Sequence, residues 1–223
     1  FSGCTGLESI DLPDSVTVIS GYAFRGCENL ASVKLPLSWQ NVSTGSYSDR
    51  SPFYDCESLT EITIPDGMTS IPDYAFYNCS SLNTVHFSDT LTEIGTYAFE
   101  NCTGLRQLTL PDSLTTIGTG AFSGCTGLSS VTIPGQVTEI QSYVFSDCTG
   151  LREVILPETL TAVYPYAFSG CSGLREISIP DSVNTLSGYA FRNCTNLTSV
   201  SLPASWSTVG NSYWNSPFAG CTS

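Results

Sequence analysis

Ten cysteines recur along the chain, and each lies three residues after a phenylalanine. They stand at positions 4, 27, 56, 79, 102, 125, 148, 171, 194 and 221, so seven of the nine intervals are 23 residues long. A fixed period of this size is typical of stacked-repeat proteins, in which one small unit buries its apolar face only against its neighbours. The spacing therefore predicts about nine stacked copies of one unit.

Every copy has the same apolar pattern. After the cysteine comes a segment such as Leu59, Ile62 and Ile64, whose alternation predicts a short strand with one buried face. A proline ends nearly every such segment, and because proline cannot donate a ladder hydrogen bond, we expect the chain to turn there. A second apolar pair, such as Leu114 and Ile117, predicts a shorter second strand. The sequence Tyr-Ala-Phe-x-x-Cys then predicts one turn of α or 3₁₀ helix.

These segments together predict an α/β repeat solenoid over residues 1–223, with parallel strands, two short strands per repeat and a short helical or 3₁₀ turn. The unbroken period predicts a single elongated domain. Nine repeats stacked at strand spacing would form a rod or shallow arc about 45 Å long. The pattern begins and stops inside a repeat, at Phe1 and Ser223, and we therefore expect a piece of a longer protein.

The cysteine column predicts buried, reduced thiols. Equivalent residues of stacked repeats have parallel side chains about 4.8 Å apart, whereas a disulfide needs Cβ atoms about 3.8 Å apart. The chain has no Cys-x-x-Cys or His-Cys spacing that would predict a metal site. We therefore expect a packing role for the cysteines, and neither a metal nor a cofactor.

The complete unit, Leu-x-x-Ile-x-Ile-Pro-Asp-x-Val-x-x-Ile-x-x-Tyr-Ala-Phe-x-x-Cys, resembles the BspA-type leucine-rich repeat. This 23-residue class occurs in bacterial surface and secreted proteins and in some parasitic protists, and the match covers essentially the whole chain. The resemblance implies a leucine-rich-repeat solenoid, a secreted or cell-surface location and an adhesin-like role in binding proteins of a host or a neighbouring cell. The class shares no catalytic residues, so the resemblance argues against an enzyme.

Composition excludes several classes of partner. The net charge is -13, with 7 basic against 20 acidic residues, so the surface repels phosphate backbones and anionic membranes. We expect no nucleic-acid binding and no membrane insertion. His86 is the only histidine, and no serine or cysteine has a base at a spacing typical of a catalytic triad. The sequence indicates no catalysis and no particular oligomeric state.

Two repeats are longer than the rest, by six residues within 36–53 and by four within 203–218. Insertions in solenoids often form the binding surface, and Trp and Tyr are frequent interface anchors. The alternative is that each tryptophan folds back and fills the space under its own loop. The candidate ligand-binding residues in these two loops are Trp39, Tyr47, Trp206, Tyr213 and Trp214.

The outward positions of the first strands form a second candidate surface, because concave sheets of repeat proteins bind other proteins. Its candidate ligand-binding residues are Glu61, His86, Glu153 and Glu176. The alternative is a plain solvated sheet. The function that the sequence favours is a non-catalytic, protein-binding repeat domain, and its rival is a passive spacer that displays another domain.

Two further columns have structural interpretations. An acidic residue follows most of the prolines, and an Asp in this position commonly accepts hydrogen bonds from nearby backbone amides, so we expect turn capping rather than calcium binding. The tyrosine of each Tyr-Ala-Phe segment is expected to pack at the edge of the core. The acids are Asp14, Asp66, Asp89, Asp112, Glu158 and Asp181.

Overall fold

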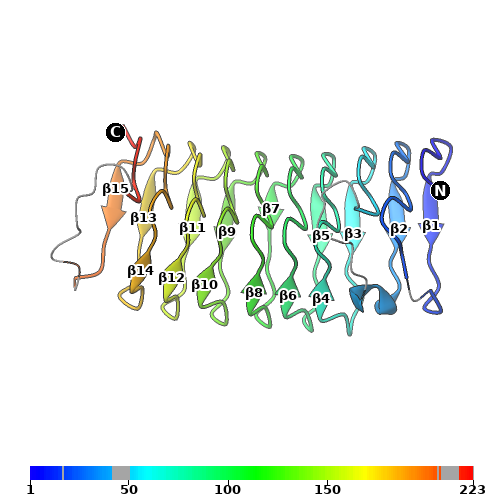
Figure 1. The fold of residues 1–223 in the computed structure, drawn as a ribbon, viewed down its shortest axis with the longest axis horizontal. Coiled ribbons are helices and arrows are strands. Elements are labelled where there is room, and N and C mark those ends of the chain that lie inside the picture. The colour runs from blue at the N-terminus through cyan, green and yellow to red at the C-terminus, as the bar shows by residue number, and fades with distance from the viewer. Residues whose placement is uncertain (17, 42–50, 205, 207–215, 223) are drawn as a thin grey trace.

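A computed structural model describes residues 1–16, 18–41, 51–204, 206 and 216–222. The chain winds into an elongated parallel β-solenoid of about eight turns, with its two termini at opposite ends of the stack (Figure 1). The prediction of about nine repeats is therefore not confirmed. The shorter second strand is found in six of the described turns.

The first sheet runs along one side of the solenoid. Its strands are β1 (Ser9–Asp11), β2 (Ser32–Lys34), β3 (Glu61–Thr63), β5 (Thr84–His86), β7 (Gln107–Leu108), β9 (Ser130–Thr132), β11 (Glu153–Ile155), β13 (Glu176–Ser178) and β15 (Ser199–Ser201). Neighbouring strands pair in parallel. For example, Ile62 of β3 lies opposite Val85 of β5. Among the described strands the hydrogen-bonded ladder is interrupted twice, between β5 and β7 and between β11 and β13.

The second sheet has shorter strands and one interruption. The strands β4 (Ser70–Ile71), β6 (Glu93–Ile94) and β8 (Thr116–Ile117) form one group, and β10 (Glu139–Ile140), β12 (Ala162–Val163) and β14 (Thr185–Leu186) form the other. Threonine side chains support this sheet from outside. The hydroxyl of Thr115, for example, donates to the carbonyl oxygen of Thr92 one turn earlier, at 3.0 Å.

The predicted helical turn is wrong for the regular repeats. In the described residues the only helix is the 3₁₀ helix η1 (Leu37–Asn41), at the start of the first extended repeat. In a regular turn two residues adopt left-handed conformations, such as Tyr97 with φ 52° and Asn101 with φ 60°. The amides of Tyr97, Phe99 and Asn101 consequently donate to carbonyl oxygens of the next turn, at 2.8–2.9 Å. Because these amides donate to the next turn and not within their own segment, the segment does not form a helix. The fold is therefore a β-solenoid rather than an α/β solenoid.

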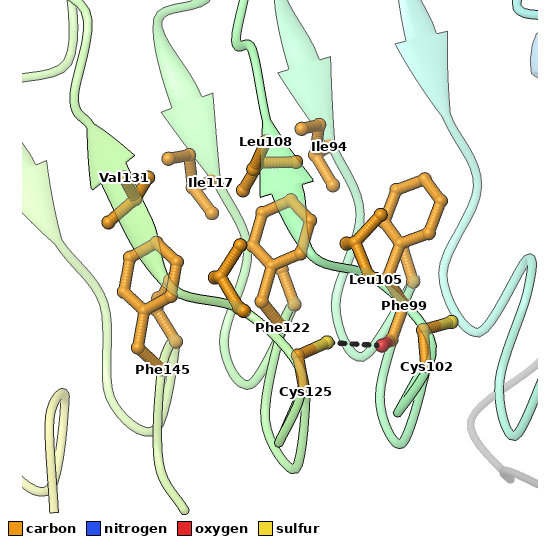
Figure 2. Close-up of a cluster of buried hydrophobic side chains, with 14 of the residues drawn as sticks. Ile94, Phe99, Cys102, Leu105, Leu108, Ile117, Phe122, Cys125, Val131 and Phe145 are labelled. Carbon is orange, nitrogen blue, oxygen red and sulfur yellow. Dashed lines mark hydrogen bonds between the residues drawn. The ribbon is translucent and has the colours of Figure 1, made fainter. Parts of the chain in front are cut away.

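A column of stacked phenylalanines fills the centre of the solenoid. Phe99, Phe122 and Phe145 lie in a row beneath aliphatic side chains of both sheets (Figure 2). The ring centroids are 5.4 Å apart between Phe99 and Phe122 and 5.6 Å apart between Phe122 and Phe145. Like residue therefore packs on like residue in neighbouring turns, and the repeats share one core.

The cysteines form a second internal column. The Cys125 thiol donates to the carbonyl oxygen of Phe99 in the preceding turn, with an Sγ–O distance of 3.3 Å (Figure 2). Burial raises the pKa of the Cys102 and Cys148 thiols well above its usual value, so both stay protonated and unreactive at neutral pH. Eight of the ten cysteines are buried, as predicted, whereas Cys4 is exposed and Cys221 is partly exposed.

The acids after the prolines cap the backbone. Asp14 Oδ1 accepts a hydrogen bond from the Leu37 amide at 3.5 Å, and Asp181 Oδ1 accepts one from the Ala204 amide at 3.3 Å. The capping prediction is confirmed at these two positions. In both cases the amide belongs to the following turn, so the carboxylates join neighbouring repeats.

The thiol column yields a direct chemical prediction. With an aromatic disulfide reagent at neutral pH, the folded chain should react at Cys4, more slowly at Cys221, and at the eight buried cysteines only after denaturation, because inaccessible protonated thiols are poor nucleophiles. Absorbance of the released thiolate counts the reacting groups. Cys4→Ser should remove the fast native reaction. Rapid native reaction at a central thiol such as Cys125 would contradict the buried column.

Candidate functional site

The first extended repeat buries its tryptophan. The Trp39 amide donates to the carbonyl oxygen of Pro36 at 3.1 Å within η1, and the indole is 0% exposed. Its ring lies edge-on to Phe53 and Phe76, with centroids 5.9 and 5.6 Å away. The indole Nε1 is buried without a hydrogen-bond partner among the described residues. Trp39 therefore packs inside the core, and its burial removes it from the candidate contact residues.

The second extended repeat begins in the same way. The Trp206 amide donates to the carbonyl oxygen of Pro203 at 2.9 Å, and the partly buried indole packs against the core. Tyr47, Tyr213 and Trp214 lie outside the described residues. Of the five aromatic candidates in the two loops, the structure therefore places one inside the core and one against it.

A depression lies beside η1. It has a volume of about 500 Å³ and is lined by apolar side chains, including the partly exposed Leu37, together with Lys34, Asp14 and Asp66. Lys34 is the only lysine of the chain, and two carboxylates share the depression with it. The site therefore combines both signs of charge and favours no single charge on a ligand.

The candidates on the first sheet are all exposed, and two of them are paired. His86 Nε2 lies 2.8 Å from Glu61 Oε1, with 55% and 61% of the two side chains exposed. The pair joins β5 to β3, where Thr63 lies opposite His86 in the parallel register. An ion pair this exposed contributes little to stability. It does hold the imidazole ring in one place on the sheet.

One depression on this face lies at the interruption between β5 and β7. Its volume is about 590 Å³, and His86, Phe87, Arg106 and Gln107 are among its lining residues. Phe87 is larger than the aliphatic residues of the same column, and its ring lies edge-on to Phe99 with centroids 6.0 Å apart. We attribute the opening of the sheet at this point to that larger side chain.

A smaller depression lies at the second interruption, between β11 and β13. Its volume is about 330 Å³, and it brings together the candidates Glu153 and Glu176 with Ile155, an apolar side chain that is 50% exposed on an otherwise polar face. The structure therefore divides the four predicted sheet residues between two sites. His86, which is paired with Glu61, lines one of them, and Glu153 and Glu176 line the other.

The tyrosine column is packed rather than projecting. Tyr143 stacks on Tyr166 with centroids 5.0 Å apart, and Tyr166 stacks on Tyr189 at 5.3 Å. Gly120, with φ +62°, interrupts the column, and the ring of Tyr97 covers the place of its missing side chain. Burial raises the pKa of the Tyr97 hydroxyl. These contacts agree with packing at the edge of the core.

Sequence reasoning missed Arg106 and Phe87 as site residues. Arg106 precedes its strand at the position that Arg152 and Arg175 occupy in later repeats, so nothing in the sequence marks it as special. A usable signal stood next to Phe87, because Ser88 replaces the proline that ends the other first strands. That departure marks the repeat in which the ladder is interrupted.

The described residues contain no group of three or more His, Cys, Asp or Glu side chains placed to hold a metal ion. In the same part of the chain, no helix has the length and apolar character needed to cross a membrane.

Comparison with known proteins places this repeat among described families. The family model for the BspA type leucine rich repeat region matches residues 1–51, 49–174 and 120–221, with six copies. A leucine-rich repeat protein of Bacteroides ovatus ATCC 8483 is 28% identical with a TM-score of 0.66, over 89% of this chain and 55% of that one. This chain therefore spans 55% of the length of that protein. No curated protein matches the sequence.

Two further solved structures are similar. The T. pallidum leucine rich repeat protein is 27% identical with a TM-score of 0.59, and the match covers 88% of this chain and 76% of that one. A leucine-rich repeat protein of Eubacterium ventriosum ATCC 27560 is 25% identical with a TM-score of 0.55, over 92% of this chain and 62% of that one. These structures share the fold of the described residues.

The buried position of Trp39 predicts a stability effect. Trp39→Ala should lower the free energy of unfolding by about 3–5 kcal/mol, because it opens a cavity beside two phenylalanines. Trp39→Phe should cost clearly less, since it keeps an aromatic ring and removes a buried N–H that has no described partner. Trp206→Ala is the matched control and should cost less than Trp39→Ala. Denaturant unfolding measures all three, and an unchanged midpoint for Trp39→Ala would contradict its burial in the core.

Proposed function

Because the chain belongs to the BspA-type leucine-rich repeat family, we propose that it is a non-catalytic, protein-binding domain of a secreted or cell-surface bacterial protein. Its partners are proteins on the surface of a host or a neighbouring cell. The family match covers nearly the whole chain and indicates no catalytic activity. The binding role is proposed for this chain alone, and only the location is proposed for the protein as a whole. This chain spans 55% of the length of the related Bacteroides ovatus protein.

The observation that carries the proposal is the pair of depressions on the exposed face of the first sheet. Each combines polar groups with apolar side chains that are unusually accessible, Phe87 in one and Ile155 in the other. Protein interfaces have this mixture of apolar contact area and directed hydrogen-bonding groups. The two sites lie on the same side of an elongated molecule, the side formed by the first strands, which suits a partner of protein size (Figure 1).

The aromatic residues of the extended repeats that lie outside the described residues remain part of the proposal. Tyr47, Tyr213 and Trp214 are proposed as additional contacts, because aromatic side chains in repeat insertions are frequent interface anchors. Trp39 is excluded by its burial, and Trp206 offers only a partly exposed ring.

The second candidate function is a passive spacer that displays another domain. The observation that favours it is the continuous phenylalanine column, which joins all the described turns through one core and would make the molecule a stiff rod. A spacer does not need an accessible isoleucine in the middle of a polar sheet. Ile155 therefore separates the two functions.

A capture experiment compares two matched substitutions. The chain is immobilised and incubated with surface-protein extracts of host epithelial cells and of co-resident bacteria, and bound proteins are identified by mass spectrometry. Ile155→Arg should abolish capture of the specific partner, because it places a charge in the contact area. Thr185→Arg, on the exposed side of the second sheet, should leave capture unchanged. The spacer would be favoured if neither the wild type nor Thr185→Arg captured a protein. Equal capture by Ile155→Arg and Thr185→Arg would also favour the spacer.

A further inference from the structure

We propose that the depression between β5 and β7 receives an acidic side chain of the partner protein, with the guanidinium group of Arg106 as its counterion. This inference rests on the proposed protein-binding function and names the chemistry of one contact. The occupant is an Asp or Glu within a segment that lies across the sheet, flanked by an apolar residue.

The floor of the depression is apolar because the sheet opens there. On β3 the inward residues Ile62 and Ile64 are only 1% and 2% exposed. The equivalent residues of the next turn, Val85 and Phe87, are partly exposed and line the depression. Core side chains are thus accessible at this point of the first sheet, and they can contact the apolar part of a partner segment.

Arg106 is an uncompensated positive charge on an acidic protein. Its side chain is exposed, and in the described part of the chain the guanidinium group has no ion pair or hydrogen bond. The outward positions of β5, β7 and β9 carry no carboxylate, and the nearest ones on this face are Glu61 on β3 and Glu153 on β11. Glu61 is already paired with His86. A carboxylate from outside therefore meets an open cation with no competing acid on these three strands.

The chemistry of the lining selects a carboxylate. A guanidinium group offers two parallel N–H donors that match the two oxygens of a carboxylate. The amide groups of Asn83 and Gln107 also line the depression and can donate to the same oxygens. An apolar residue beside the acid would cover Val85 and Phe87, which adds contact area to the charge pairing.

The position of the depression favours a side chain over a chain terminus. It lies in the interior of the first sheet, with exposed polar strands on both sides along the axis of the solenoid (Figure 1). A partner segment can therefore continue across the face in both directions. A free C-terminal carboxylate is the competing source and is tested as a separate arm.

The test uses four acetylated heptapeptides of the sequence Ser-Gly-X-Leu-Ser-Gly-Ser. Three are amidated and carry Glu, Gln or Lys at X, and the fourth carries Gln with a free C-terminal carboxylate. Dissociation constants come from titrations followed by the backbone and Arg Nε resonances of the labelled protein. We expect the Glu peptide to bind about fivefold or more tightly than the Gln peptide, to bind more tightly than the Lys peptide, and to shift the signals of Val85, Phe87 and Arg106.

Three variants make the result specific. Arg106→Gln should remove the preference for Glu, and Arg106→Lys should retain only part of it, because lysine keeps the charge but loses the planar fork. Arg152→Gln is the matched control, since Arg152 is exposed at the same position of its repeat and does not line the depression. It should keep the full preference. Unchanged thermal midpoints show that the variants fold.

Three results would overturn the inference. The first is equal affinity for the Glu and Gln peptides. The second is an equal loss of the preference for Glu in Arg106→Gln and Arg152→Gln, because the preference would then depend only on the net charge of the protein. A preference for the free C-terminal carboxylate over the internal Glu would reject a passing segment. If the peptides fail while a protein is still captured in an Ile155-dependent way, this contact is wrong and the protein-binding function stands.

Discussion

From Phe76 to Phe191, each phenylalanine of the column is bound to the next turn in three ways, and these contacts fix the register of the solenoid. The ring of Phe99 stacks on Phe122 at 5.4 Å, its amide donates to Ala121 at 2.8 Å, and its carbonyl oxygen accepts the Cys125 thiol at 3.3 Å. The Phe-x-x-Cys spacing therefore has one physical cause. A shift of register would break all three contacts in each of these turns.

The surface features depend on where neighbouring turns keep this register and where the hydrogen-bonded ladder of the first sheet is interrupted. The core column is continuous, whereas the first sheet is interrupted at β5 and β7 and at β11 and β13. The depressions at these interruptions are lined by Phe87, an inward residue that is only partly buried, and by Ile155, an outward residue of β11. The candidate contacts thus lie where packing inside the stack opens the outer ladder, on a scaffold that the phenylalanine column keeps rigid.

The sequence period predicted the repeat, the two strands and the buried thiols, because each depends on residue type at a fixed spacing. The helical turn was wrong because Tyr97 adopts φ 52°, a left-handed conformation uncommon for a bulky residue and not readable from a hydrophobic pattern. Arg106 could not be identified because its importance depends on the interruption of the ladder beside it. The burial of Trp39 rests on contacts with Phe53 and Phe76 of later turns, which the spacing of apolar residues does not specify.

The central claim is that neighbouring turns share one core, and a comparison of Phe122→Ala with Phe218→Ala tests it most directly. Phe122 is fully buried between two rings, whereas Phe218 is partly buried and, among the described residues, stacks only on Phe191. Urea unfolding should show a loss of about 3–5 kcal/mol for Phe122→Ala and a much smaller loss for Phe218→Ala. Equal losses at the two positions would contradict a shared stack and indicate a core that does not depend on neighbouring turns.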